Sequence, residues 1–209
     1  STNDQFTLNA ISTPEWLKLD GGDGGNDEVR IVANADIKLT NALAEIRGTI
    51  QQNVVVQRFE NAALFGGAAA NLLDGRDFPG RLYLEGGDGD DKLIAGSNND
   101  VLRGGVGNDQ LFGNGGDDRL YGDTGDDFLS GGLGNDELYG SHGRDILLAG
   151  YGADLLVGGE GQDLLVSGEV LGLVDSDFDD LARQIVRSTW SDTQLTYEQR
   201  VVALRDTGA

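Results

Sequence analysis

The sequence predicts an all-β fold, in which short parallel strands wind into a β-solenoid that ends in a small C-terminal cap of two helices. Three observations predict it. Nine blocks of nine residues follow one another without a gap from Gly86 to Val166, and every block has Asp at its sixth position and Leu at its eighth. Glycine recurs at the first and fourth positions of nearly every block. After Val166 the nine-residue period ends and helix signals begin.

Each block is one unit of turn and strand. A unit that recurs without slipping stacks on copies of itself, because a single copy cannot bury its own apolar side. We expect the first six residues to form a turn and the last three a short strand whose Leu points inward. The fourth residue is Gly in eight blocks and Asn98 in the other, and we expect Asn98 to keep the positive φ of the turn. The blocks read GGDGDDKLI, AGSNNDVLR, GGVGNDQLF, GNGGDDRLY, GDTGDDFLS, GGLGNDELY, GSHGRDILL, AGYGADLLV and GGEGQDLLV.

Two blocks return the chain to its starting side, so successive strands fall alternately on two parallel sheets with the leucines between them. The aspartates of the odd and even blocks then form rows along opposite edges, with neighbours about 4.8 Å apart. The odd row contains Asp91, Asp109, Asp127, Asp145 and Asp163. The even row contains Asp100, Asp118, Asp136 and Asp154.

Such rows require a cation. Two carboxylates about 5 Å apart repel by roughly 3 kcal/mol at an effective dielectric constant near 20. The turns offer carboxylate and main-chain carbonyl oxygens, and no Cys or repeated His is present, which favours Ca²⁺. The net charge of −21 and pI near 4.1 agree with an inventory of cation ligands.

The blocks resemble the RTX (repeats-in-toxin) hemolysin-type calcium-binding nonapeptide family, whose pattern is GGxGxDxUx with U a large apolar residue. The resemblance implies a right-handed parallel β-roll with each Ca²⁺ held between turns of successive coils. Pairing each block with the second one after it gives about seven ions, four on the odd edge and three on the even edge.

The resemblance also implies a ligand set: the nine aspartates and the main-chain carbonyls at the second and fourth positions. Asn114, Asp123 and Ser141 replace the second Gly, and we expect a mild effect because the carbonyl is the ligand. We expect acids at the fifth position, such as Asp90 and Asp117, to be solvated rather than ligands. The carbonyl set is Gly87, Gly89, Gly96, Asn98, Gly105, Gly107, Asn114, Gly116, Asp123, Gly125, Gly132, Gly134, Ser141 and Gly143.

The repeats divide the chain into three expected parts: a β-rich flank over residues 1–65, the calcium-binding roll over 66–166, and the helical cap over 167–209. In the flank, residues 22–30 (GDGGNDEVR) place Asp27 and Val29 in phase with the repeat, which predicts degenerate β-helical rungs. Independent antiparallel strands are the alternative for this flank.

The cap is predicted from FDDLARQIVRS after Asp177 and from the capping box TYEQ at Thr196. Outward-facing positions become apolar in the last three blocks, which predicts a surface that the cap covers, or alternatively a docking surface for another domain or subunit. These positions are Ile146, Leu148, Leu155, Val157, Leu164 and Val166.

The residue types present in the chain limit the functions it can have. The single His142 occupies a variable turn position and no nucleophile motif is present, so we expect no enzyme activity. The sequence has no stripe of basic residues that could bind nucleic acid. It also has no apolar run of 18 residues that could insert into a membrane. The partners expected are calcium ions, with self-assembly or upstream domains of the same polypeptide left open.

By resemblance, the protein is an extracellular bacterial module, many relatives of which leave the cell by type I secretion. Because the chain begins at Ser1 with no signal peptide, we expect a mature fragment or a cut-out domain. The chain contains 34 glycines, and the acidic rows repel, so we expect the repeats to fold only when Ca²⁺ binds. Two functional classes stay open: a calcium-dependent structural or binding module, and the C-terminal export and folding domain of a secreted enzyme or toxin.

Overall fold

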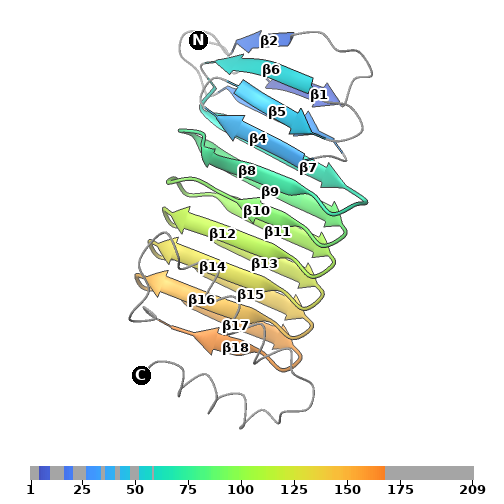
Figure 1. The fold of residues 1–209 in the computed structure, drawn as a ribbon. Coiled ribbons are helices and arrows are strands. Elements are labelled where there is room, and N and C mark those ends of the chain that lie inside the picture. Colours follow the sequence, from blue (N-terminus) through green and yellow to red (C-terminus); the bar gives the residue numbers. More distant parts are fainter. Residues whose placement is uncertain are drawn as a thin grey trace, which may run out of the picture. The chain divides into compact units, whose positions relative to one another are not determined.

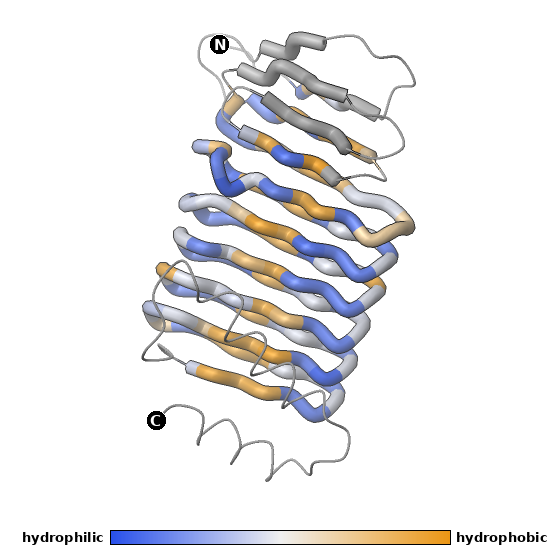
Figure 2. Tube along the Cα trace, in the orientation of Figure 1, coloured by the Kyte–Doolittle hydropathy of each residue, from blue (hydrophilic) through white to orange (hydrophobic). Residues whose placement is uncertain are grey.

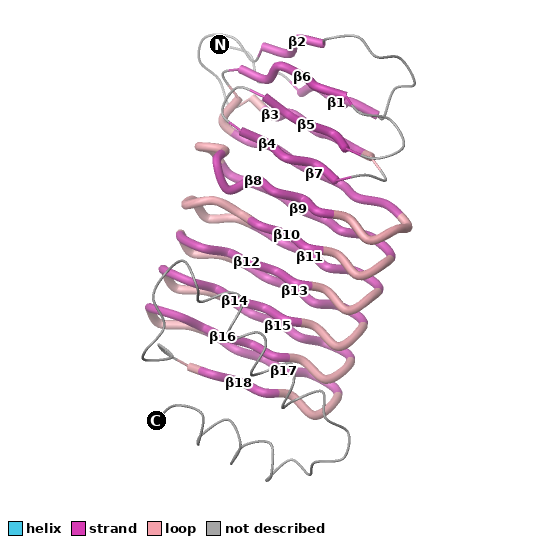
Figure 3. Tube along the Cα trace, viewed as in Figure 1, coloured by secondary structure: helices cyan, strands magenta, loops and turns pink. Residues whose placement is uncertain are grey.

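Parallel β-strands stacked into two sheets make up the part of the chain that the structure describes (Figure 1). The structure is a computed structural model, and it describes residues 5–9, 17–20, 27–33, 36–40, 43–47, 52–57 and 59–167. Within these ranges every regular element is a strand (Figure 3), and no helix is long and apolar enough to cross a membrane. The expected two-helix cap lies outside the described residues and stays a prediction.

One sheet has eight strands in the order β1-β3-β7-β9-β11-β13-β15-β17, and the other has ten in the order β18-β16-β14-β12-β10-β8-β4-β5-β6-β2. The strands are β1 (Gln5–Asn9), β2 (Leu17–Asp20), β3 (Glu28–Val32), β4 (Asp36–Thr40), β5 (Leu43–Arg47), β6 (Gln52–Gln57), β7 (Asn61–Gly67), β8 (Leu72–Asp77), β9 (Arg81–Asp88), β10 (Lys92–Ile94), β11 (Val101–Val106), β12 (Gln110–Gly115), β13 (Arg119–Thr124), β14 (Phe128–Leu133), β15 (Glu137–His142), β16 (Ile146–Tyr151), β17 (Leu155–Glu160) and β18 (Leu164–Val166).

The core is a double row of leucines between the two sheets. Leu102 in β11 lies opposite Leu84 and Leu120 in the parallel strands on either side, so one coil takes 18 residues. Figure 2 shows the apolar stretches repeating along the strands, with polar residues at the turns. Each fully buried Leu contributes about 1.5–3 kcal/mol. The predicted two-sheet solenoid with inward leucines is therefore confirmed. The fully buried leucines of the repeats are Leu84, Leu93, Leu102, Leu111, Leu120, Leu129, Leu138 and Leu147.

The strands are longer than the sequence predicted. From β11 to β17 each strand contains six residues, which are the last three of one block and the first three of the next. The parallel pairing continues through the glycines, for example from Gly105 to Asp123 and from Val106 to Thr124. The predicted six-residue turn was wrong, because glycine at positive φ bends the strand without ending its pairing, and only positions four to six form the turn.

The N-terminal flank contains both kinds of pairing that the sequence left open. Strands β1, β3 and β7 extend the eight-stranded sheet in parallel, and β4 pairs in parallel with β8. Strand β5, in contrast, is antiparallel to both β4 and β6.

The apolar outward positions of the last blocks do not form one surface. Ile146 and Leu148 belong to β16 of the ten-stranded sheet, whereas Leu155 and Val157 belong to β17 of the eight-stranded sheet. Leu164 and Val166 lie in β18, which pairs with β16, so four of the six residues share the ten-stranded sheet, and there Ile146 and Leu148 are only 6% and 7% exposed. The expected patch of six is therefore divided into four residues and two, because consecutive strands of the repeats lie on different sheets.

Candidate metal centre

The aspartates at the sixth position form the two predicted rows, and hydrogen bonds link the members of each row. In the odd row, the main-chain N–H of Asp91 donates to Asp109 Oδ1 at 2.8 Å, and that of Asp109 donates to Asp127 Oδ1 at 2.8 Å. The N–H of Asp127 donates to Asp145, and that of Asp145 to Asp163, at 2.9 and 3.0 Å. The even row repeats the arrangement at 2.7, 2.9 and 2.9 Å. One oxygen of each of these carboxylates therefore binds the main chain of the preceding coil.

The second carboxylate oxygen has no such partner in six of these aspartates. In each of them Oδ2 is buried and makes no hydrogen bond, although the residue is at most 2% exposed. A buried polar atom without a partner destabilises the fold by about 1–3 kcal/mol, and more when it is charged. These oxygens are thus placed to contact something other than protein. They belong to Asp91, Asp109, Asp118, Asp127, Asp136 and Asp145.

Burial also raises the pKa values of the rows, because the charged form is removed from water. Neighbouring carboxylates of the same row add to the rise at several positions, while the main-chain N–H donors oppose it. The pKa is raised to about 6 for Asp91, Asp100, Asp136 and Asp145, to about 7 for Asp109, and to about 8 for Asp118 and Asp127. Without a cation, several of these buried carboxyl groups would hold protons at neutral pH.

Main-chain oxygens supply the remaining polar surface of the turns. Gly105 and Gly107 have φ of 115° and 139°, and a Cβ on either would collide with the carbonyl oxygen of Gly87 or Gly89 in the preceding coil. Glycine avoids this collision because it has no Cβ. At the first position, the space beside Gly86 holds both Asp91 Oδ2 and the carbonyl of the next coil.

The non-glycine residues at the second position keep the same backbone. Asn114, Asp123 and Ser141 have φ of 68°, 73° and 85°. Asp123 also accepts two hydrogen bonds from Arg103, at 3.1 and 3.0 Å. Their carbonyls are therefore oriented by the same left-handed backbone as those of the glycines, which is compatible with the mild effect that we expected.

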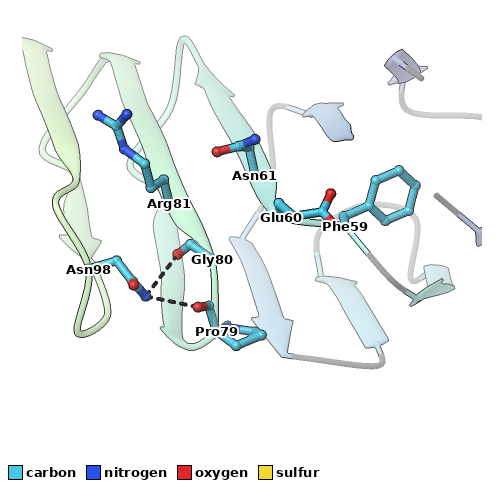
Figure 4. A pocket seen from close by; sticks show the side chains of 7 residues that line it. All are labelled: Phe59, Glu60, Asn61, Pro79, Gly80, Arg81 and Asn98. Atoms are coloured by element: carbon cyan, nitrogen blue, oxygen red, sulfur yellow. Dashed lines mark hydrogen bonds between the residues drawn. The ribbon is translucent and has the colours of Figure 1, made fainter. Parts of the chain in front are cut away.

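Asn98 departs from its prediction. Neither Asn98 nor Gly96 adopts a positive φ. The amide of Asn98 instead donates to the carbonyls of Pro79 and Gly80 at 2.9 and 3.3 Å (Figure 4). The coil below this turn ends in Phe78, Pro79 and Gly80 and not in a repeat turn, so Asn98 meets a different surface and the expectation of a left-handed residue was wrong.

The fifth position has a role that the sequence analysis missed. The N–H of Asn108 donates to Asp90 Oδ1, that of Asp126 to Asn108 Oδ1, and that of Arg144 to Asp126 Oδ1, at 2.8, 2.8 and 2.9 Å. The other edge repeats the pattern with Asn99, Asp117, Asn135 and Ala153. These side chains tie successive turns together on the exposed side. The recurrence of Asp or Asn at this position was the signal.

Side chains alone do not make a metal site here. In the described ranges no group of three or more His, Cys, Asp and Glu residues gathers around one point. An ion would therefore need carboxylate oxygens together with main-chain carbonyls, which are the hard oxygen ligands that Ca²⁺ prefers. His142 is 67% exposed and lies 3.9 Å from the Glu160 carboxylate.

A family model for the "RTX calcium-binding nonapeptide repeat (4 copies)" matches residues 83–111, 112–147 and 139–169. The stacked turns are RTX repeats. RTX repeats bind Ca²⁺, and the unpartnered oxygens of these turns fit that ion.

A search of curated proteins finds no match. Eight chains of solved structures match. One of them is the extracellular lipase LipA from Serratia marcescens, with 16% sequence identity and a TM-score of 0.23. The match covers 73% of this chain, and the chain spans 31% of the lipase chain.

Proposed function

We propose that this chain is a non-catalytic, calcium-binding β-roll module of a secreted or cell-surface bacterial protein, and that its RTX repeats fold when Ca²⁺ binds. The observation that carries the proposal is the set of six buried, unpartnered carboxylate oxygens along the two rows. Because these oxygens are six in number and recur at regular spacing, they favour one kind of bound ion repeated along the rows, and not unrelated packing defects at single residues.

The fifth position provides an internal comparison. There, the odd edge places Asp90, Asn108, Asp126 and Arg144 in successive coils, so that no two carboxylates are neighbours. At the sixth position, one residue further along, Asp follows Asp in every coil, and it is buried in the first seven blocks, from Asp91 to Asp145. Carboxylates about 5 Å apart repel by roughly 3 kcal/mol even at a dielectric constant near 20, so only the sixth position needs a cation. This contrast supports an ion within the buried rows and none at the exposed fifth position.

The proposed ligands are the aspartate carboxylates and the main-chain carbonyls at the second and fourth positions, as the resemblance implied. The close approach of those carbonyls to the next coil supports this assignment, as at Gly87 and Gly89. The gaps between stacked turns of the nine blocks correspond to about seven ions, and the expectation that there are possibly more is kept with the proposal. When bound, Ca²⁺ would neutralise the rows and coordinate the carboxylate oxygens that lack a hydrogen-bond partner.

Folding and binding are coupled in this proposal. Ordering a glycine-rich chain is costly in entropy, and without a cation the rows must either repel or hold protons. Binding of ions to the folded state alone shifts the equilibrium toward it. The test is circular dichroism and hydrodynamic radius of the whole chain in calcium and in chelator. At about pH 8, where the rows are no longer stabilised by bound protons, we expect strand signal and compaction only in calcium, and equal strand signal in chelator at that pH would refute the coupling.

The proposal keeps four further expectations: an extracellular location, right-handed coiling, a division at residues 65/66 and 166/167, and a helical cap after the repeats. The alternative function is an export and folding domain of a type I-secreted enzyme or toxin with its catalytic domain upstream. The reading frame before Ser1 distinguishes the two, because a protease or lipase signature there favours the alternative.

A further inference from the structure

We infer that one of the seven gaps between stacked turns holds no ion, so that the chain binds six calcium ions. The closed gap lies between the turn at residues 95–100 and the turn above it at residues 113–118. This inference rests on the proposed function, and it concerns which turns of this chain take part in it.

Three hydrogen bonds occupy the polar groups of the closed gap. The main-chain N–H of Gly96 donates to Asp100 Oδ2 at 3.1 Å, so that this carboxylate has both oxygens bonded. The side-chain amide of Asn114 donates to the Ala95 carbonyl at 2.7 Å. The N–H of Gly115 donates to the Gly96 carbonyl at 3.2 Å.

The backbone explains why this turn differs. In the other eight blocks the second residue has a positive φ, whereas Gly96 does not. With the ordinary backbone, the N–H of the second residue turns toward the Asp, in the place where a cation would sit. A donor that already bonds Asp100 Oδ2 satisfies the carboxylate and leaves no place for a second positive partner.

The same arrangement recurs in the coil before the first of the nine blocks, where the sixth position is not an aspartate. Asn71 holds the sixth position of residues 66–74, and its Oδ1 accepts from the N–H of Gly67 at 2.8 Å. Gly67, like Gly96, lacks a positive φ. The turn of Asp100 thus has the geometry of a turn with a neutral side chain, although its residue is an aspartate.

The remaining carboxylates account for the count of six. The unpartnered Oδ2 atoms number four in the odd row and two in the even row. Beside Gly131, for example, a Cβ would lie 2.4 Å from Asp136 Oδ2 and 2.6 Å from the carbonyl oxygen of Ala149 in the next coil, so both oxygens line the same small volume. Asp154 and Asp163 belong to the last two blocks, and no further block follows them in sequence. Asp100 is therefore the aspartate of the first seven blocks whose Oδ2 is already bonded.

The experiment is a count of bound ions by equilibrium dialysis and metal analysis, on the whole chain at saturating calcium. The variants are Asp100→Asn and, as the matched change in the same row, Asp136→Asn. We expect six ions in the unchanged chain, six in Asp100→Asn and five in Asp136→Asn.

Seven ions in the unchanged chain, or the loss of one ion in Asp100→Asn, would overturn the inference while leaving the proposed function intact. A chain that binds no calcium would instead overturn the proposed function, and the inference with it. The count in the unchanged chain decides the question even where a variant does not fold.

Discussion

Replacing Asp127 by Asn separates the two roles of the buried aspartates, which are to accept a hydrogen bond from the preceding coil and to bind a calcium ion. Asp127 Oδ1 accepts the N–H of Asp109 at 2.8 Å, whereas Oδ2 is buried and unpartnered. Asn keeps the first oxygen and replaces the second by an NH₂ group, which cannot bind a cation. The hydrogen bond between coils survives and one calcium ligand is lost.

The magnitude follows from the lost ion. An ion present at 100 times its dissociation constant stabilises the folded state by about 2.7 kcal/mol, so Asp127→Asn should lower the free energy of unfolding by about that amount in calcium. Asp127→Ala also leaves the buried N–H of Asp109 without an acceptor, which costs a further 1–3 kcal/mol or so. Urea unfolding followed by circular dichroism, at fixed free calcium, measures both.

The matched control is Asp126→Asn, one residue away and with the same change of charge. Asp126 is at the exposed fifth position, where Oδ1 accepts from the Arg144 N–H and the carboxylate pairs with its guanidinium. Asn keeps the main-chain bond, and an exposed ion pair contributes at most about 1 kcal/mol. Equal losses from the changes at 126 and 127 would refute the assignment of the ions to the buried row.

Three further predictions test the backbone, the core and the protonation of the rows. Gly125→Ala should destabilise the folded state by about 1–3 kcal/mol in urea unfolding, because φ is 135° and the new Cβ meets the Gly107 carbonyl, whereas Gly115→Ala, whose nearest contact would be 3.8 Å, should be tolerated. Leu129→Ala should cost about 2–5 kcal/mol in the same assay, against less than about 0.5 for Leu133→Ala, since the first side chain is fully buried and the second is 60% exposed; similar costs would contradict the described core. In chelator, the buried aspartates have folded-state pKa values of about 6 to 8, above the ordinary 3.8, so they bind protons more tightly when folded. Their contribution to the stability of the metal-free fold is then full below about pH 4 and is lost as the pH rises through 6 to 8, which a pH series of circular dichroism spectra checks; stability that rises with pH over this range would contradict it.

Much of the fold could be predicted from the sequence because its periodicities are local. Leu at the eighth position of every block determines which side of each strand faces the core, and a two-block coil then determines which aspartates stack. Both follow from side-chain alternation and repeat length, and the structure has Leu102 opposite Leu120 as predicted.

The errors arose where a residue's conformation depends on the coil below it. Glycine suggested a long turn, but the pairing of Gly105 with Asp123 keeps the strand continuous. Asn98 suggested a left-handed residue, but its amide bonds to the Pro79–Gly80 turn, which does not belong to the repeat. The sequence does mark this pair of turns, because Asn98 and Asn114 both replace a Gly of the pattern and their turns stack on one another. The mark is visible only when each block is compared with the block 18 residues further along.

A crystal structure of the chain grown in calcium, with anomalous scattering to locate the ions, tests the central claim most directly. We expect an ion beside Oδ2 of each of the six unpartnered aspartates, and none between the turns at residues 95–100 and 113–118. Rows of carboxylates without ions beside them, in protein that is folded and saturated with calcium, would contradict a calcium-binding role for the buried aspartates.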